Sequence, residues 1–163
     1  AVEKLGMDPM VFIRRLVVAC SEDIGLANPQ AMVQAVAAME AYHRIGWPES
    51  RYMVAQAILF AVESPKSNSI PLAISRALET MNRIGDAEVP LHLRDAHYKG
   101  AEQLGHKGYK YPHDYPGHYV EQDYLPAPIR DAQFFVASEQ GMEEKIRQNQ
   151  QRRRRGRPNT ENG

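Results

Sequence analysis

The stretch Met53–Val62, which reads MVAQAILFAV, is apolar at almost every position. Trp47-Pro48-Glu49 comes just before it, so we expect a helix that begins near Pro48, where the missing amide hydrogen of proline costs nothing. A helix that is apolar nearly all round is usually enclosed on more than one side. Two alternatives stay open: this helix is the central helix of the domain, or another subunit covers part of it.

Two further helices are expected upstream of this stretch. Asp8-Pro9 and Asn28-Pro29 each combine an N-cap residue with a proline at the first helical position. Gly25 and Gly46 stand where these helices should end, because glycine readily adopts the left-handed backbone that closes a helix. The second helix is rich in alanine, which allows a neighbouring helix to come close.

Downstream, apolar residues recur at helical spacing over Ile70–Ile84, with Ser67 or Asn68 as the cap and Gly85 as the end. We expect a short extended or single-turn segment near Leu91, a weaker helix over 96–104 and a polar helix over 139–152. The predicted fold is therefore all-α, a helical bundle or array with little or no sheet. We expect one helical domain over 1–152 and a flexible basic tail over 153–163.

Residues 106–128 form an irregular segment rich in tyrosine and proline, which we call the strap. Five of the chain's 8 tyrosines lie between Tyr109 and Tyr124. Its prolines break both helical and alternating periods. Disordered segments are poor in aromatic residues, so we expect the strap to be ordered, to lie over the helical body, and to bury its rings while each hydroxyl finds a partner.

Composition places the chain among ordinary globular proteins of about one domain. Its 163 residues carry 20 basic and 20 acidic side chains. The charge is uneven, however: Glu143–Gly163 has seven basic and three acidic residues, so it is +4 and the rest of the chain is −4. The single cysteine, Cys20, fits a reducing compartment. With neither a secretory signal nor an apolar run of about 20 residues, we expect a cytoplasmic protein without membrane contact.

The sequence offers no catalytic constellation. It contains no glycine-rich phosphate loop, and Lys66-Ser67 lacks the glycines that would shape one, so a helix cap is the better explanation. Glu22 and Asp23 are adjacent and would diverge on a helix, which favours a solvated face or a local cap. Cys20 lies on an apolar face and should be an inert thiol. The spacing of His106, His113 and His118, with Asp114, matches no zinc pattern. We therefore expect no catalytic, metal or cofactor site.

A nucleic-acid contact is the alternative function that the residues suggest. A run of arginines attracts phosphates without sequence specificity, and aromatic rings near lysines can stack on bases. The acidic body and the expected burial of the rings argue against this contact. The candidate residues are Lys107, Lys110, Arg152, Arg153, Arg154, Arg155 and Arg157.

Several separated motifs together resemble one family. They are Ser21–Ala31 (SEDIGLANPQA), Pro65–Asn68 (PKSN), Pro90–Arg94 (PLHLR) and Gly108–Pro126 (GYKYPHDYPGHYVEQDYLP). In this order they are similar to the C-terminal region of the RarA/MgsA family of AAA+ ATPases, bacterial relatives of the Werner-helicase-interacting protein. The matching positions are Ser21, Glu22, Asp23, Gly25, Pro65, Lys66, Ser67, Asn68, His92, Arg94, Tyr109, Tyr111, His113, Asp114, Tyr115, Pro116, Tyr124 and Pro126.

The resemblance implies an all-α fold related to the collar domain of clamp-loader subunits. It implies self-association, as a tetramer, in an ATPase that acts on DNA at stalled replication forks together with single-strand-binding and other fork proteins, near the nucleoid. It also implies that ATP and magnesium bind in an ATPase core N-terminal to this region, which makes the region itself non-catalytic. Besides a self-association domain and a nucleic-acid-binding module, the third hypothesis is a small helical enzyme, and no motif supports it.

Overall fold

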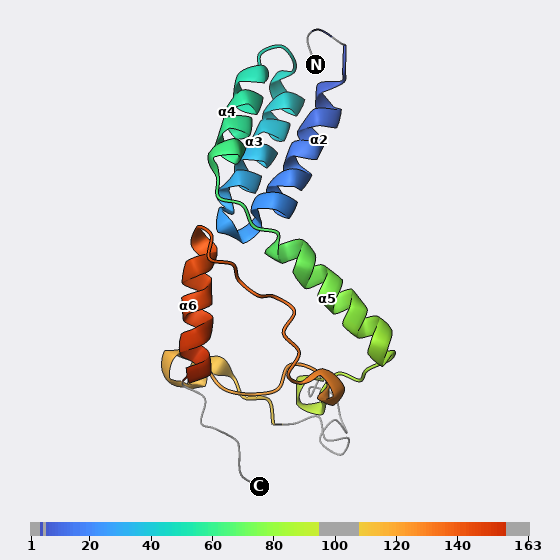
Figure 1. Cartoon of the computed structure of the whole chain (residues 1–163), viewed down its shortest axis with the longest axis vertical. Helices are drawn as coiled ribbons and strands as arrows, with labels where there is room; N and C mark the ends of the chain where they lie inside the picture. The colour runs from blue at the N-terminus through green and yellow to red at the C-terminus, as the bar shows by residue number, and fades with distance from the viewer. Residues whose placement is uncertain (1–3, 5, 95–107, 156–163) are drawn as a thin grey trace. The chain divides into compact units, whose positions relative to one another are not determined.

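The computed structural model describes residues 4, 6–94 and 108–155, apart from the side chains of 154 and 155. In this part of the chain there are helices and turns but no strand, which confirms the all-α prediction (Figure 1). The α-helices are α2 (Pro9–Ala19), α3 (Gln30–Ile45), α4 (Arg51–Glu63), α5 (Ser69–Ile84) and α6 (Met142–Arg155). None of the described helices is long and apolar enough to cross a membrane.

The chain divides into two compact units. The first consists of Ala1–Ile74 with Phe135–Gly163, and the second of Ser75–Phe134. We describe each unit by itself. The expected division into a domain over 1–152 and a tail over 153–163 stays a prediction.

The first helix begins as its sequence predicts. Asp8 is the N-cap, and its carboxylate accepts a hydrogen bond of 2.9 Å from the Met10 amide, with Pro9 at the first helical position. The α-helix passes into a π-helical turn at Cys20–Ile24, and Gly25, with φ 51°, ends it. Gly25 is therefore the stop that was predicted, because an L side chain is disfavoured at this backbone angle.

Helix α3 begins after Pro29 and ends at Gly46, which has φ 84°. The expectation that Asn28 caps this helix is wrong. Its side-chain amide donates a 3.0 Å hydrogen bond to the Ser64 hydroxyl instead. Asn28 thus links the start of α3 to the end of α4, residues 36 positions apart.

Helix α3, not α4, is the central helix of the first unit, since α3 packs against both α2 and α4 (Figure 1). The first alternative for Met53–Val62 is therefore wrong. Only one face of α4 is covered, through Val54, Ala57 and Ala61. The helix was expected to begin near Pro48 but begins at Arg51. Pro48 lies in a turn that precedes the helix.

Helix α5 follows a short loop and behaves as predicted at both ends. The Ser67 hydroxyl accepts a hydrogen bond from the Ser69 amide at 3.2 Å, and Gly85, with φ 65°, ends the helix. Leu91–Leu93 forms the expected single turn. The helix predicted over 96–104 lies outside the described residues.

The strap in the second unit is ordered into short 3-10 turns at Pro112–Asp114 and Pro116–His118. The Gln122 side chain holds them by bonding both the amide and the carbonyl of Lys110, at 3.1 and 2.9 Å. The expected burial of the rings is wrong, however: the strap tyrosines are 37–54% exposed. Polar side-chain to backbone bonds hold this backbone, so ring burial is not required.

Candidate functional site

Alanines make up about half of the buried core of the first unit, together with Ile13, Cys20, Ile24 and Val54. Its two clusters of buried residues hold Ala31, Ala35 and Ala61 in one, and Ala38 and Ala57 in the other. Alanine allows close helix approach but buries little apolar area. Among the large apolar side chains of α3 and α4, Val54 is the one that is buried, and the others are partly buried or exposed.

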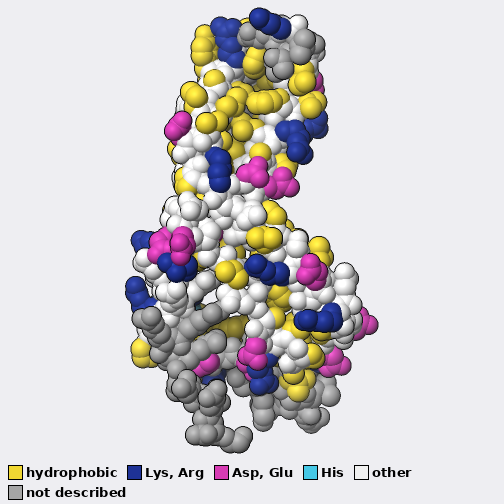
Figure 2. Space-filling view, in the orientation of Figure 1, with side chains coloured by type: hydrophobic (Ala, Val, Ile, Leu, Met, Phe, Trp, Pro, Cys, Tyr) yellow, Lys and Arg dark blue, Asp and Glu magenta, His cyan; other side chains and the backbone are white. Residues whose placement is uncertain are grey.

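Many of these large side chains lie on the surface. On α4, Tyr52 and Leu59 are each 65% exposed and Val62 is 63% exposed. On α3, Met32, Val33 and Val36 are exposed as well. Figure 2 shows hydrophobic side chains gathered over the part of the surface that α2, α3 and α4 form. We call the exposed apolar residues of α3 and α4 the apolar surface.

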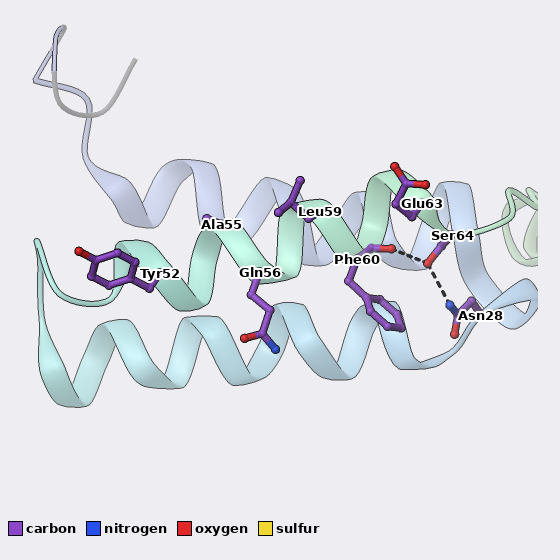
Figure 3. Close-up of a pocket in the computed structure, with 8 residues that line it drawn as sticks. All are labelled: Asn28, Tyr52, Ala55, Gln56, Leu59, Phe60, Glu63 and Ser64. Atoms are coloured by element: carbon purple, nitrogen blue, oxygen red, sulfur yellow. Dashed lines mark hydrogen bonds between the residues drawn. The ribbon is translucent and has the colours of Figure 1, made fainter.

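A shallow groove of about 600 Å³ runs along α4 within this region (Figure 3). Gln56 and Phe60 point toward α3, and the Gln56 amide donates a 3.2 Å hydrogen bond to Gln34 on that helix. The groove is mainly apolar and contains one carboxylate. Its lining residues are Asn28, Tyr52, Ala55, Gln56, Leu59, Phe60, Glu63 and Ser64.

The end of the groove is fixed by hydrogen bonds around Ser64. This hydroxyl donates to the Phe60 carbonyl at 2.7 Å and accepts from Asn28. Lys66 lies beyond it and donates to the carbonyls of Ala61 at 2.6 Å and Ser64 at 2.8 Å. A cation beside the last carbonyls of α4 stabilises the C-terminal end of this helix. Lys66 is thus a C-terminal helix cap, which agrees with the preference for a cap over a phosphate site.

A buried carboxylate, Glu143, ties α6 to the rest of the first unit. Its side chain is 0% exposed. One oxygen accepts from the Ser69 hydroxyl at 2.5 Å and the other from the Ser138 amide at 2.6 Å. Burial by itself raises the pKa of the Glu143 carboxyl, but the hydrogen bonds from these serines outweigh it and leave the pKa lowered.

The SEDIG motif contributes backbone to this junction, and its acidic side chains stay outside. The Asp23 carbonyl accepts from the Ser67 amide at 2.8 Å, whereas the side chains of Glu22 and Asp23 are exposed. The prediction of a solvated acidic face is confirmed. Cys20 is buried, and burial raises the pKa of its thiol although Lys66 acts in the opposite direction. This fits the inert thiol that the sequence predicts.

Gly141 closes the same junction. It has φ 51°, and a Cβ atom there would overlap the Ala27 carbonyl oxygen and lie 2.7 Å from the Pro65 ring. Only glycine fits this close approach between the start of α6, the loop after Gly25, and the PKSN segment. Gly141 and Glu143 are therefore the structural residues that the sequence alone did not reveal.

Signature residues in the second unit make local contacts of their own. The His92 ring lies 2.8 Å from the Asp123 carbonyl, and Arg94 bonds Glu88 at 2.7 Å and the Val89 carbonyl at 2.8 Å. In the strap, the His113 ring lies between those of Tyr111 and His118, with centroids 5.0 and 4.9 Å away. The described residues contain no cluster of three or more His, Cys, Asp or Glu side chains that could hold a metal ion. His106 lies outside them.

The candidate nucleic-acid residues are only partly described. Arg152 and Arg153 are exposed on the last turns of α6, and Lys110 donates to the Glu121 carbonyl at 3.4 Å. Arg154 and Arg155 belong to the α6 backbone, but their side chains are not described. Lys107 and Arg157 lie outside the described residues. No common surface is thus defined for the whole set.

These features define a class: an all-α region in which a lysine-bearing loop caps a helix, and in which a buried carboxylate ties α6 to the first turn of α5. Its sequence matches the family described as the C-terminal region of MgsA AAA+ ATPases over residues 2–154. The chain therefore belongs to this family, and the resemblance drawn from its motifs is confirmed.

Individual relatives agree. The chain is 48% identical to replication-associated recombination protein A of Bacillus subtilis over 131 residues, which cover 78% of this chain and 31% of that protein. It is 40% identical to an AAA domain-containing protein of Mycobacterium tuberculosis over 142 residues, 86% of this chain and 31% of the relative. It is 36% identical to replication-associated recombination protein A of Escherichia coli over 143 residues, which cover 86% of this chain and 32% of that protein. The chain thus spans about a third of the length of these relatives.

Proposed function

We propose that this region is a self-association domain, forming a tetramer that holds AAA+ ATPase modules together. The observation that carries the proposal is the packing of α3 and α4: apart from Val54 their buried residues are alanines, whereas many of their large apolar side chains are exposed. Large contiguous apolar patches on soluble proteins mark interaction sites. Interfaces between permanently associated subunits resemble a core cut in two. The second alternative for Met53–Val62, that another subunit covers part of it, is thereby favoured.

The energy available at this surface supports stable assembly. Complete burial of a leucine, valine or aromatic side chain contributes about 1.5–3 kcal/mol. Tyr52, Leu59 and Val62 each keep more than 60% of their surface exposed. A second copy that covered them would recover much of this energy at each contact.

The activity proposed for the complete assembly lies beyond this chain. The relatives are about three times as long as the matched region. We propose that ATP and magnesium bind in the part of such proteins that this chain does not cover, and that this region has no catalysis of its own. From the names of its relatives we propose a role in replication-associated recombination, with DNA and fork proteins as partners. Hydrolysis of ATP by this 163-residue chain would contradict the proposal that this region has no catalytic activity of its own.

Substitution of the apolar surface tests self-association. We expect Leu59→Asp to shift the solution mass, measured by light scattering, from near four times 18.4 kDa toward a monomer, since it would bury an unpaired charge. Val89→Asp is the matched control, because Val89 is 54% exposed but lies in the other unit. Equal masses for both variants and the wild type would contradict a role for this surface.

A nucleic-acid-binding role is the second candidate, and the exposure of the strap rings favours it. Exposed rings are available to stack on bases, which contributes about 1–3 kcal/mol per base. Truncation before Arg152 should reduce the salt dependence of single-stranded DNA affinity, because the slope of log K against log salt is about −0.7 per phosphate contact. Tyr111→Ala should weaken binding without changing this slope. Affinity that is absent or independent of salt in the intact chain would exclude the candidate.

A further inference from the structure

Helix α4 presents a short apolar seam to the outside. Tyr52, Leu59 and Val62 are the three most exposed large apolar side chains among the described residues, at 65, 65 and 63%. Ala55, which is also exposed, lies between the first two. The four residues recur at intervals of three, four and three, which is the spacing of the apolar seam in a two-helix coiled coil. We call these four residues the α4 seam.

The α4 seam lies on the opposite side of the helix from the residues that α3 covers. At about 100° per residue, its four members fall within an arc of about 80°. Val54, Ala57 and Ala61 form the buried face and lie across the helix from this arc. Leu59 points away from α3 (Figure 3). A second helix can therefore pack along the seam without displacing α3.

The seam is self-complementary about Ala57. Tyr52 and Val62 each lie five residues from this position, on opposite sides of it. Ala55 and Leu59 each lie two residues from it. When two α4 helices cross antiparallel at Ala57, Tyr52 of each copy is level with Val62 of the other. Ala55 is likewise level with Leu59, so a small side chain faces a large one, as close interdigitation requires. This matching is a property of α4 paired with itself.

The charges at the ends of the seam follow the same symmetry. Arg51 and Glu63 are both exposed, and each lies six residues from Ala57. They border the seam on its two sides, about 120° apart around the helix. The Arg51 guanidinium donates to the Tyr52 hydroxyl at 3.1 Å and lies 5.0 Å from the centre of that ring, so the cation is held at the seam. An antiparallel pair places Arg51 of each copy level with Glu63 of the other, whereas a parallel pair would place like charges together.

We propose that two copies of this chain associate through their α4 helices, which pack antiparallel along the α4 seam. The contact is isologous, because the same patch is used by both copies and a two-fold axis passes at the level of Ala57. This inference rests on the proposed self-association and goes further by naming the surface and its orientation. A tetramer with two-fold symmetry makes more than one contact of this kind, and the seam is one of them.

Exchange of the end charges tests the arrangement in the 163-residue chain. Arg51→Glu and Glu63→Arg each turn two attractive pairs into repulsive ones. Either variant alone should therefore raise the dissociation constant of the assembly at least about tenfold, measured by sedimentation velocity. An equimolar mixture of the two should recover the wild-type affinity, because every pair between unlike copies is again of opposite charge. Glu79→Arg, at an exposed position of the other unit, is the control and should leave the affinity unchanged.

Engineered cysteines test the orientation directly. Ala55→Cys mixed with Leu59→Cys should form a disulfide between the two variants on oxidation, because these positions face each other in the antiparallel pair. Either variant alone should form little disulfide, since like positions are offset by about 6 Å along the helix axes, beyond good disulfide geometry. Cys20 is buried and should not react.

The outcomes separate this inference from the broader proposal. If the wild type assembles and neither charge variant weakens it, or the mixture does not recover, the seam is not an interface between copies. Disulfides that form in each variant alone and not between the two would contradict the antiparallel orientation. If the wild type itself is a monomer at every concentration, self-association fails and this inference with it. Circular dichroism of each variant shows whether it is folded, and the cysteine pair keeps the test open if a charge variant is not.

Discussion

The hydroxyl of Ser69 donates a 2.5 Å hydrogen bond to the carboxylate of Glu143, a residue 74 positions away in the sequence. This bond joins the first turn of α5 to the first turn of α6. The second carboxylate oxygen is bonded by the Ser138 amide. Both oxygens of a fully buried carboxylate are thus satisfied, so the charge is retained in the interior.

Glu143→Gln should destabilise the protein. The glutamine side chain keeps one acceptor, and its amide group cannot accept from the second donor, which leaves a buried donor without a partner. The expected loss is about 1–3 kcal/mol of unfolding free energy, measured by urea denaturation. Glu144→Gln is the neighbouring control, because Glu144 bonds Arg147 and Gln148 near the surface. Equal effects of the two substitutions would contradict the role of the buried junction.

The Glu143 carboxylate also makes the free energy of unfolding depend on pH. Its pKa is lowered on folding, so its contribution is complete above the ordinary carboxyl value of 4.5 and is lost as the pH falls through the folded value. The difference in unfolding free energy between the wild type and Glu143→Gln should therefore shrink below about pH 4.5. A difference that stays constant between neutral and acidic pH would show that the folded pKa is not lowered.

Two glycine substitutions separate backbone strain from steric overlap. Gly46 and Gly141 both have positive φ, but a Cβ at Gly46 meets nothing within 4 Å, whereas one at Gly141 overlaps the Ala27 carbonyl. Gly46→Ala should cost about 1–3 kcal/mol from strain alone, because Gly46 has φ 84° and ψ 179°, a backbone region that is essentially restricted to glycine. Gly141→Ala should lower the melting temperature clearly more, since the overlap adds to the strain. The reverse order would contradict the close approach at this junction.

Lys66→Met tests the helix-capping role of the PKSN lysine. Loss of the hydrogen bonds to the Ala61 and Ser64 carbonyls should cost about 1 kcal/mol, measured by thermal unfolding. Lys145→Met provides the control, because Lys145 is exposed on α6. Stabilisation of the wild type by ATP that vanishes in Lys66→Met would instead indicate a phosphate site.

Local features of the fold were predictable from the sequence, and long-range features were not. Asp8-Pro9 and Gly25 mark the ends of the first helical stretch because caps depend on neighbouring residues. The apolar pattern of Met53–Val62 predicts burial but does not identify the partner, so it leaves open whether α4 is central or is covered by another subunit; in the structure α3 holds the central place. Nothing near Glu143 points to Ser69, since acidic residues are common in the first turn of any helix.

The strap illustrates the same limit. Its prolines predict irregular backbone, and the 3-10 turns confirm this. Whether a tyrosine ring is buried depends on which residues pack against it, and the composition of the strap does not predict those residues. Gln122, which bonds the Lys110 backbone on both sides, holds the segment and carries no motif that would have singled it out.

The central claim is self-association, and sedimentation velocity of the 163-residue chain over a concentration series tests it most directly. The proposed function predicts a dominant species near four times 18.4 kDa that dissociates only on dilution. A single species of 18.4 kDa at every concentration would contradict it, and the exposed apolar residues of α3 and α4 would then need another protein to cover them.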